Sequence, residues 1–184
     1  AGGLGLFAIQ LAKLAGAKVV AIVSSDEKIK ICKNFGADFV INRKKDFPAS
    51  FTDENGAPDY LAWRKVGLKL KSIKCPDIDL VFEHVGRDTL GLSTYLLKRG
   101  GRIVTCAATS GFQATIDLRF LWMQVKSIIG SHFANYHEAN EAAKLVFDKK
   151  IVPVVYSKTN IIELPKMMDK MYAGKTHGKI VFKH

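Results

Sequence analysis

The sequence predicts an α/β fold with a doubly wound, mostly parallel sheet. Short apolar runs alternate with helical segments along the chain, and the connections between them are short. Such alternation is typical of parallel strands covered by helices. The run 18–23 is mostly β-branched, as expected for a strand buried on both faces. Gly36 follows the segment 26–35 where glycine commonly ends a helix.

The expected elements follow one another in regular order. Strands are expected at 18–23, 38–41, 78–83, 102–106, 127–133, 151–156 and 179–182. Helices are expected at 6–15, 26–35, 60–72, 89–97, 118–124, 137–147 and about 163–172. The polar segment 42–57 is interpreted as a loop. Crossovers between parallel strands should be right-handed.

The chain begins with glycines that lead into a helix. Gly2, Gly3 and Gly5, with Leu4 among them, directly precede the apolar, alanine-rich stretch 6–15. Glycines before a helix let backbone N–H groups approach a diphosphate, and the helix N-terminus adds partial positive charge. A complete dinucleotide fingerprint has another glycine upstream, after a strand. We therefore expect a Rossmann-like fold whose first strand is truncated, as part of a longer protein.

The composition favours one compact globular region. Of the 184 residues, 48% are hydrophobic, which is sufficient for a core. No run reaches the roughly 18 apolar residues that cross a membrane, and no secretion leader is visible. The three cysteines are far apart and lack metal-ligand spacing. They suit reduced thiols in a cytoplasmic protein.

The net charge of +11 is spread along the chain. The densest clusters are 43–45 and 64–74, and the second places lysines on one face of an expected helix. A solvated helix face is the favoured interpretation. A nucleic-acid surface is a remote alternative, because no basic arm or recognised nucleic-acid module accompanies the lysines.

Hydroxyl and basic side chains follow the first two expected strands. In a doubly wound sheet the ligand lies beyond the C-terminal strand ends. Ser24 and Ser25 come directly after the run 18–23, and Lys28 follows one helical turn later. This pattern favours the 2′-phosphate of NADP, which a carboxylate would repel. Arg43 could add a second cation or stack on adenine. The alternative is that Ser25 only caps a helix and Lys28 is a surface lysine.

Two later strand ends carry further candidates. His84 follows the expected strand 78–83 and could titrate near neutrality. Small residues from Ala107 onward leave room for a flat ring such as nicotinamide, and His132 ends the strand 127–133. Taken alone, such histidines are more often structural than catalytic. No hydrolase, metalloprotease or Walker A motif is present, which fits hydride transfer, where the protein mainly positions a cofactor.

These motifs together resemble the medium-chain dehydrogenase/reductase superfamily, on its zinc-independent quinone-reductase side. The general resemblance lies in 2–12, 24–28 and 36–38. A tighter similarity, to the crotonyl-CoA carboxylase/reductase family, lies in 53–63, 82–87, 100–107, 121–123 and 128–136. The resemblance covers essentially the whole chain, and the blocks around Phe82 and His132 are the most specific.

The resemblance implies an NADPH-dependent enzyme acting on an enoyl-CoA. Hydride would go to the β-carbon, and the resulting enolate would attack CO2 at the α-carbon. By position, Lys28 and Arg43 would face the 2′-phosphate. Other implied cofactor contacts lie in two places. Gly2, Gly3, Leu4 and Gly5 would lie at the diphosphate, and His84, Ala107 and Ser131 at the ribose and nicotinamide. His132 resembles the family histidine that helps hold CO2 through water.

The resemblance also implies an organisation. Residues 1–150 would form the NADP-binding domain, and 151–184 would return toward a catalytic lobe. Without that lobe we expect the chain alone to be inactive. A cytoplasmic homo-oligomer without nucleic-acid or membrane partners is expected. The less polar segment 111–117 predicts altered contacts on the coenzyme A side. The alternatives are a quinone oxidoreductase, a non-carboxylating enoyl reductase and a non-catalytic nucleotide-binding module.

Overall fold

The computed structural model describes residues 1–183 and divides into two compact units. The first unit contains residues 1–43 and 134–183, and the second contains 44–133. The strands form sheets of two, three and two members, and every pair of neighbouring strands is parallel. The α/β class with parallel strands is therefore confirmed. Within residues 1–183, no helix is long and apolar enough to cross a membrane.

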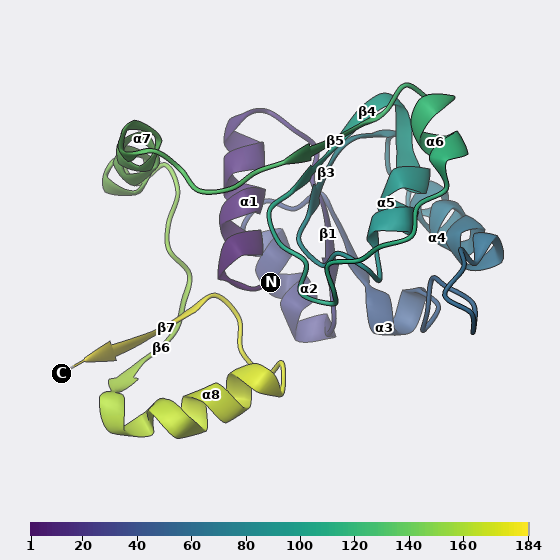
Figure 1. Ribbon diagram of the computed structural model, residues 1–184. Coiled ribbons are helices and arrows are strands. Elements are labelled where there is room, and N and C mark those ends of the chain that lie inside the picture. The colour runs from purple at the N-terminus through teal and green to yellow at the C-terminus, as the bar shows by residue number, and fades with distance from the viewer. Residues whose placement is uncertain (184) are drawn as a thin grey trace. The chain divides into compact units, whose positions relative to one another are not determined.

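The N-terminal part of the first unit pairs two strands and packs two helices on them. The strands β1 (Val20–Val23) and β2 (Phe39–Asn42) lie in register from Val20 with Phe39 to Val23 with Asn42. The helices are α1 (Gly3–Leu14) and α2 (Asp26–Asn34) (Figure 1). The buried core consists of Leu6, Ile9, Val23, Cys32 and Ala37. Gly36, with φ +97°, allows the turn that ends α2, because positive φ is costly for other residues.

The C-terminal part of the first unit holds the remaining sheet. The strand β6 (Val155–Asn160) pairs with β7 (Lys179–Lys183). The helical elements are α7 (Tyr136–Phe147), the 3₁₀ turn η1 (Ile161–Glu163) and α8 (Leu164–Tyr172). Asn135 and Glu138 form a reciprocal capping box that satisfies backbone N–H groups at the start of α7.

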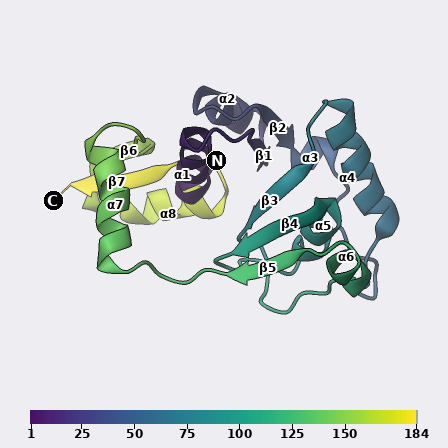
Figure 2. The same cartoon turned by 90° about the horizontal axis from the view of Figure 1, so that it is seen from above.

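The second unit is a three-stranded sheet with helices against it. Its strands are β3 (Ile78–Glu83), β4 (Leu97–Thr105) and β5 (Ser127–Gly130), with β4 in the middle. Its helices are α4 (Tyr60–Ser72), α5 (Leu90–Leu96) and α6 (Leu118–Trp122), and α3 (Arg43–Asp46) begins at the boundary between the units. In Figure 2, α5 lies between the sheet and α4. The fully buried Trp63 packs against the rings of Tyr60, Tyr95 and Phe120.

Several boundaries differ from those expected. The segment 42–57, predicted as a loop, contains α3. The strand β4 begins at Leu97 rather than 102, because Leu97 pairs with Ile78 and a register shift absorbs the residues around Gly100, whose φ is +73°. The strand β5 ends at Gly130. The strand expected at 151–156 instead occupies Val155–Asn160.

The segment before β6 is bonded to a residue distant in sequence. The side-chain amide of Gln10 accepts a hydrogen bond from the Val152 N–H at 2.8 Å and donates one to the Val152 carbonyl at 3.0 Å. A side chain thereby takes the backbone groups that a neighbouring strand would have used. Strand pairing with β7 starts three residues later, at Val155.

Candidate functional site

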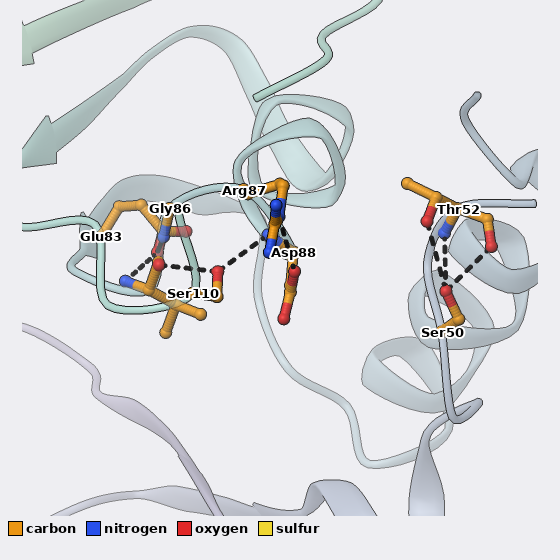
Figure 3. A network of polar contacts seen from close by, with 8 residues as sticks. Ser50, Thr52, Glu83, Gly86, Arg87, Asp88 and Ser110 are labelled. Carbon is orange, nitrogen blue, oxygen red and sulfur yellow. Dashed lines mark hydrogen bonds and ion pairs between the residues drawn. The ribbon is translucent and has the colours of Figure 1, made fainter. Parts of the chain in front are cut away.

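A buried carboxylate organises the end of β3. Glu83 is only 4% exposed. Its Oε1 accepts hydrogen bonds from the N–H groups of Val85 at 2.8 Å and Gly86 at 3.3 Å, and from the Thr89 hydroxyl at 3.0 Å. Its Oε2 accepts one from the Ser93 hydroxyl at 2.7 Å. The carboxylate therefore ties the turn after β3 to the first turns of α5. Figure 3 shows Glu83 beside Gly86 of that turn.

The turn after β3 is in turn joined to the loop after β4. The Ser110 hydroxyl donates to the Val85 carbonyl at 2.8 Å and accepts from the Asp88 N–H at 3.1 Å. The Arg87 N–H donates to the Gly111 carbonyl at 2.9 Å. Figure 3 shows Ser110, from the loop after β4, bonded to Asp88 of the turn after β3. The two loops thus form one hydrogen-bonded wall.

Gly86 lies where that wall is tightest. Its φ is +91°, and a Cβ at this position would come within 2.7 Å of the Gly111 carbonyl oxygen and 2.8 Å of the Ala108 Cα. Carbon atoms in proteins do not approach backbone atoms so closely without displacing them. Glycine is therefore required here by both backbone conformation and space.

An open cavity of about 490 Å³ lies beside this wall. Its volume falls within the range of roughly 300 to 1,000 Å³ that is usual for ligand sites. Its lining includes Gly86 and Gly111 from the wall, and the predicted site residues Ala107, Ser131 and His132. The structure thus brings three of the predicted residues together at the C-terminal ends of β4 and β5. The Ser131 N–H donates to the Thr105 carbonyl at 2.8 Å and continues the strand pairing into the cavity lining.

The two predicted histidines differ in surroundings. His132 is exposed, and its ring centre lies 3.9 Å from that of Phe133. His84 is half-buried on the turn held by Glu83, and it is not part of the cavity lining. Its Nδ1 is buried and has no hydrogen-bond partner among residues 1–183. A buried polar atom without a partner is unusual and is suited to a ligand contact.

The predicted diphosphate residues lie at the start of α1. Gly2 is the N-cap residue, and its carbonyl accepts from the Leu6 N–H at 3.0 Å. No atom lies within 4 Å of a Cβ built on Gly2 or Gly5. At Gly3 the aliphatic end of Lys179 lies 2.5 Å from such a Cβ. The N–H groups of this first turn have no acceptor within the helix, so the site fits an anionic group.

The predicted 2′-phosphate residues gather at the ends of β1 and β2. Val23 pairs with Asn42, so the register places Ser24 and Arg43 at neighbouring strand ends. Arg43 is exposed, as the first residue of α3. Ser25 caps α2, with its hydroxyl accepting from the Lys28 N–H at 3.5 Å. The Lys28 ammonium donates to the Gly174 carbonyl at 2.8 Å.

Sequence reasoning missed two residues at these sites. Lys179 places a cation beside Gly3, but 176 positions separate them and no motif links the two. The sequence does not point to Glu83, because a single carboxylate at a strand end carries no spacing signal. The hydroxyls of Thr89 and Ser93, at fixed helical spacing just downstream, were the available hint.

The metal-binding potential of residues 1–183 is small. No group of three His, Cys, Asp or Glu side chains in this part of the chain is placed to hold a metal ion. The donor set of residues 1–183 therefore does not fit a zinc centre.

The chain is similar to several known proteins. The model of the family described as zinc-binding dehydrogenase matches residues 3–148. The chain is 44% identical to a crotonyl-CoA reductase of Streptomyces collinus and 38% identical to a crotonyl-CoA carboxylase/reductase of Cereibacter sphaeroides. These matches cover 97% and 95% of this chain but 40% and 42% of those proteins. The chain thus spans about two fifths of the length of these relatives.

A solved structure of a related enzyme is also similar to this chain. A 2-octenoyl-CoA carboxylase reductase in complex with NADP and 2-octenoyl-CoA matches with a TM-score of 0.86 and 35% identity. The match covers 97% of this chain and 40% of that chain. The similarity to crotonyl-CoA carboxylase/reductases that the sequence blocks predicted is confirmed.

Proposed function

The chain belongs to the zinc-binding dehydrogenase family, and we propose that it is the NADPH-binding part of an enoyl-CoA reductase that also captures CO2. The observation that carries this proposal is the similarity, along 97% of the chain, to a carboxylase reductase whose structure holds NADP and an enoyl-CoA. The glycines at the start of α1 and the cavity beside Gly86 support it, because they fit a diphosphate and a flat ring.

The first unit would hold the phosphate groups of the cofactor. Backbone N–H groups of Gly3, Leu4 and Gly5 would donate to the diphosphate at the N-terminus of α1. Lys28 and Arg43 would face the 2′-phosphate, and Lys28 would exchange its bond to the Gly174 carbonyl for one to phosphate. Ser24 and Ser25 would add hydroxyl donors.

The second unit would hold the reactive end. When bound, NADPH supplies a hydride to the β-carbon of the enoyl thioester. Small residues around Ala107 leave room for a planar ring, and Ser131 would contact ribose or carboxamide groups. His84 lies on the adjoining turn, outside the cavity lining, and its unpartnered Nδ1 is proposed as a further contact of the bound cofactor. His132, at the cavity, would orient CO2 through a water molecule.

The proposal extends to the protein of which this chain would be a part. Residues 1–150 would serve as the NADP-binding domain, and 151–184 would lead back to a catalytic lobe. We propose a cytoplasmic homo-oligomer, and we propose that the chain alone lacks turnover.

The decisive experiment uses the full-length protein. NADPH and NADH oxidation would be followed with crotonyl-CoA, with and without bicarbonate, and the product identified by mass. We expect NADPH to be preferred and bicarbonate to give a carboxylated product, and His132→Asn to lower the carboxylated fraction. A saturated thioester as the only product would leave a simple reductase. Absence of oxidation would favour the quinone-reductase or binding-module alternatives.

A further inference from the structure

The hydrogen bonds of Glu83 are unevenly divided between its two oxygens. Oε1 accepts from two backbone N–H groups, of Val85 and Gly86, and from the Thr89 hydroxyl. Within the described residues 1–183, Oε2 accepts from the Ser93 hydroxyl alone. The residue is 4% exposed, so water has little access to replace these bonds. A buried carboxylate persists only where its oxygens are satisfied in this way.

The bonds of Oε1 reach the cavity through the turn. With its N–H groups held by Glu83, the turn points its carbonyls at the loop after β4, where Ser110 donates to Val85. Gly86 then packs against Ala108 and Gly111. Gly86, Ala108 and Gly111 all line the cavity. The position of one cavity wall therefore depends on Oε1, whereas Oε2 only ties the carboxylate to the body of α5.

We propose that Glu83 is a positioning residue for the cofactor. It sets the turn that carries His84 and Gly86, and thereby the wall against which the nicotinamide end of NADPH rests. Glu83 itself touches no cofactor, because it is buried behind the turn. This inference rests on the proposed function, since it assumes that NADPH occupies the cavity.

Because the hydrogen bonds are divided unevenly between the two oxygens, two nearly isosteric variants should differ in which of these bonds they keep. In Glu83→Gln the amide oxygen keeps the bonds to Val85, Gly86 and Thr89, and the amide N–H₂ turns to the Ser93 oxygen, since a hydroxyl both donates and accepts. In Glu83→Met the side chain has similar length and no strong acceptor. Two backbone N–H groups of the turn then lose their partner in a buried place.

Ser93→Ala is the matched control. It removes a hydrogen bond from the same buried carboxylate, but it leaves the bonds of Oε1 to the turn. Both Ser93→Ala and Glu83→Met should lower thermal stability. A merely structural role for Glu83 would make their effects on cofactor binding alike.

The experiment measures NADPH binding by fluorescence titration of the full-length protein and its three variants, well below their unfolding temperatures. Hydrogen exchange of the peptide around Val85 and Gly86 is measured in parallel. We expect Glu83→Met to raise the NADPH dissociation constant by roughly ten- to hundredfold, as misplaced contacts do. Its Val85 and Gly86 amides should exchange faster. Glu83→Gln and Ser93→Ala should stay within about twofold of the wild type.

The outcomes separate this inference from the proposed function. If Glu83→Met binds NADPH as the wild type does, or if Ser93→Ala weakens binding equally, the positioning role is wrong while the proposed function stands. A wild-type protein that binds no NADPH overturns both. Because binding is measured without an enoyl-CoA, a protein that binds NADPH but reduces no thioester would overturn only the proposed reaction.

Discussion

The ends of β1 and β3 both lead into residues predicted to lie near a cofactor, and the structure holds these two ends in different ways. After β1, Ser24, Ser25 and Lys28 are half-buried, and Lys28 makes its bond to a single backbone carbonyl of Gly174. After β3, Glu83 is buried and accepts four hydrogen bonds. Exposed partners can be exchanged for a ligand at little cost, because water compensates the intermediate state. Buried ones cannot.

The difference separates ligand contacts from scaffold. At the end of β1 the proposed phosphate contacts are made by side chains that can change partner. At the end of β3 the buried side chain fixes a turn, and the proposed contacts belong to the turn. Substitutions at the two ends should therefore differ in whether they affect stability or binding.

The largest expected effect is at Gly86. In Gly86→Ala the new Cβ would meet the Gly111 carbonyl and the Ala108 backbone, at a φ of +91°. We expect the free energy of unfolding to fall by about 3 kcal/mol, from strain and overpacking together. Chemical denaturation of the full-length protein measures the change. The control is Gly130→Ala, which lines the same cavity and has no atom within 4 Å of its Cβ. An equal loss in both variants would contradict the close contact at Gly86.

Substitution of a second glycine, Gly5, should raise stability while weakening NADPH binding. Gly5 lies inside α1 with no atom near its Cβ, so Gly5→Ala should raise stability slightly, by up to about 1 kcal/mol from helix propensity. The methyl group would nevertheless obstruct the approach of a diphosphate. We expect the NADPH dissociation constant to rise on the order of tenfold, or about 1.4 kcal/mol. Titration with NADPH measures this.

Gly67→Ala provides the control for helix propensity. Gly67 lies within α4 and has only ordinary contacts, at 3.9 Å, around its Cβ position. The Gly67→Ala variant should gain similar stability, and its NADPH binding should be unchanged. Unchanged binding in Gly5→Ala would mean that the first turn of α1 does not approach the diphosphate.

The elements best predicted from sequence are those whose limits are set locally. The helix Tyr60–Ser72 and the strand Ile78–Glu83 match their predicted bounds, because Asp59 caps the helix and Glu83 is the last residue before a turn. The start of β4 was not predicted, because Gly100 and Gly101 favour a break in a strand unless its partner strand is known. The start of β6 was not predicted either, and the segment before it is bonded to Gln10, far away in sequence.

The clustering of candidate residues at the cavity was predictable to a similar degree. Ala107, Ser131 and His132 could be brought to one cavity because parallel strands end at the same edge. Glu83, behind the turn after β3, and Lys179, beside Gly3, could not be predicted. Glu83 acts through backbone N–H groups, and Lys179 lies far from Gly3 in the sequence. Residues that act through the backbone leave little trace in a sequence pattern.

The smallest expected effect tests an exposed contact of the first unit. The Val19 N–H and the Lys13 ammonium donate to Asp38 at 2.7 and 2.9 Å, and they hold the pKa of Asp38 below its ordinary value of 3.8. The carboxylate therefore stabilises the fold above that value, and the contribution is lost as pH falls through the lowered pKa. Asp38→Asn should cost less than about 1 kcal/mol at neutral pH, because the ion pair is partly solvated.

The stability cost of Asp38→Asn should disappear at acid pH. Denaturation of the wild type and Asp38→Asn at neutral and acid pH measures it, with Asp169→Asn, an exposed position on α8, as the control. The difference between wild type and Asp38→Asn should shrink as pH falls below 3.8 and through the lowered pKa, where the wild-type carboxyl also becomes neutral. If the difference persisted unchanged in acid, the hydrogen-bond geometry of the carboxylate, rather than its charge, would be what stabilises this end of the first unit. The contact would then belong with the buried network at Glu83 rather than with the exchangeable partners at the end of β1.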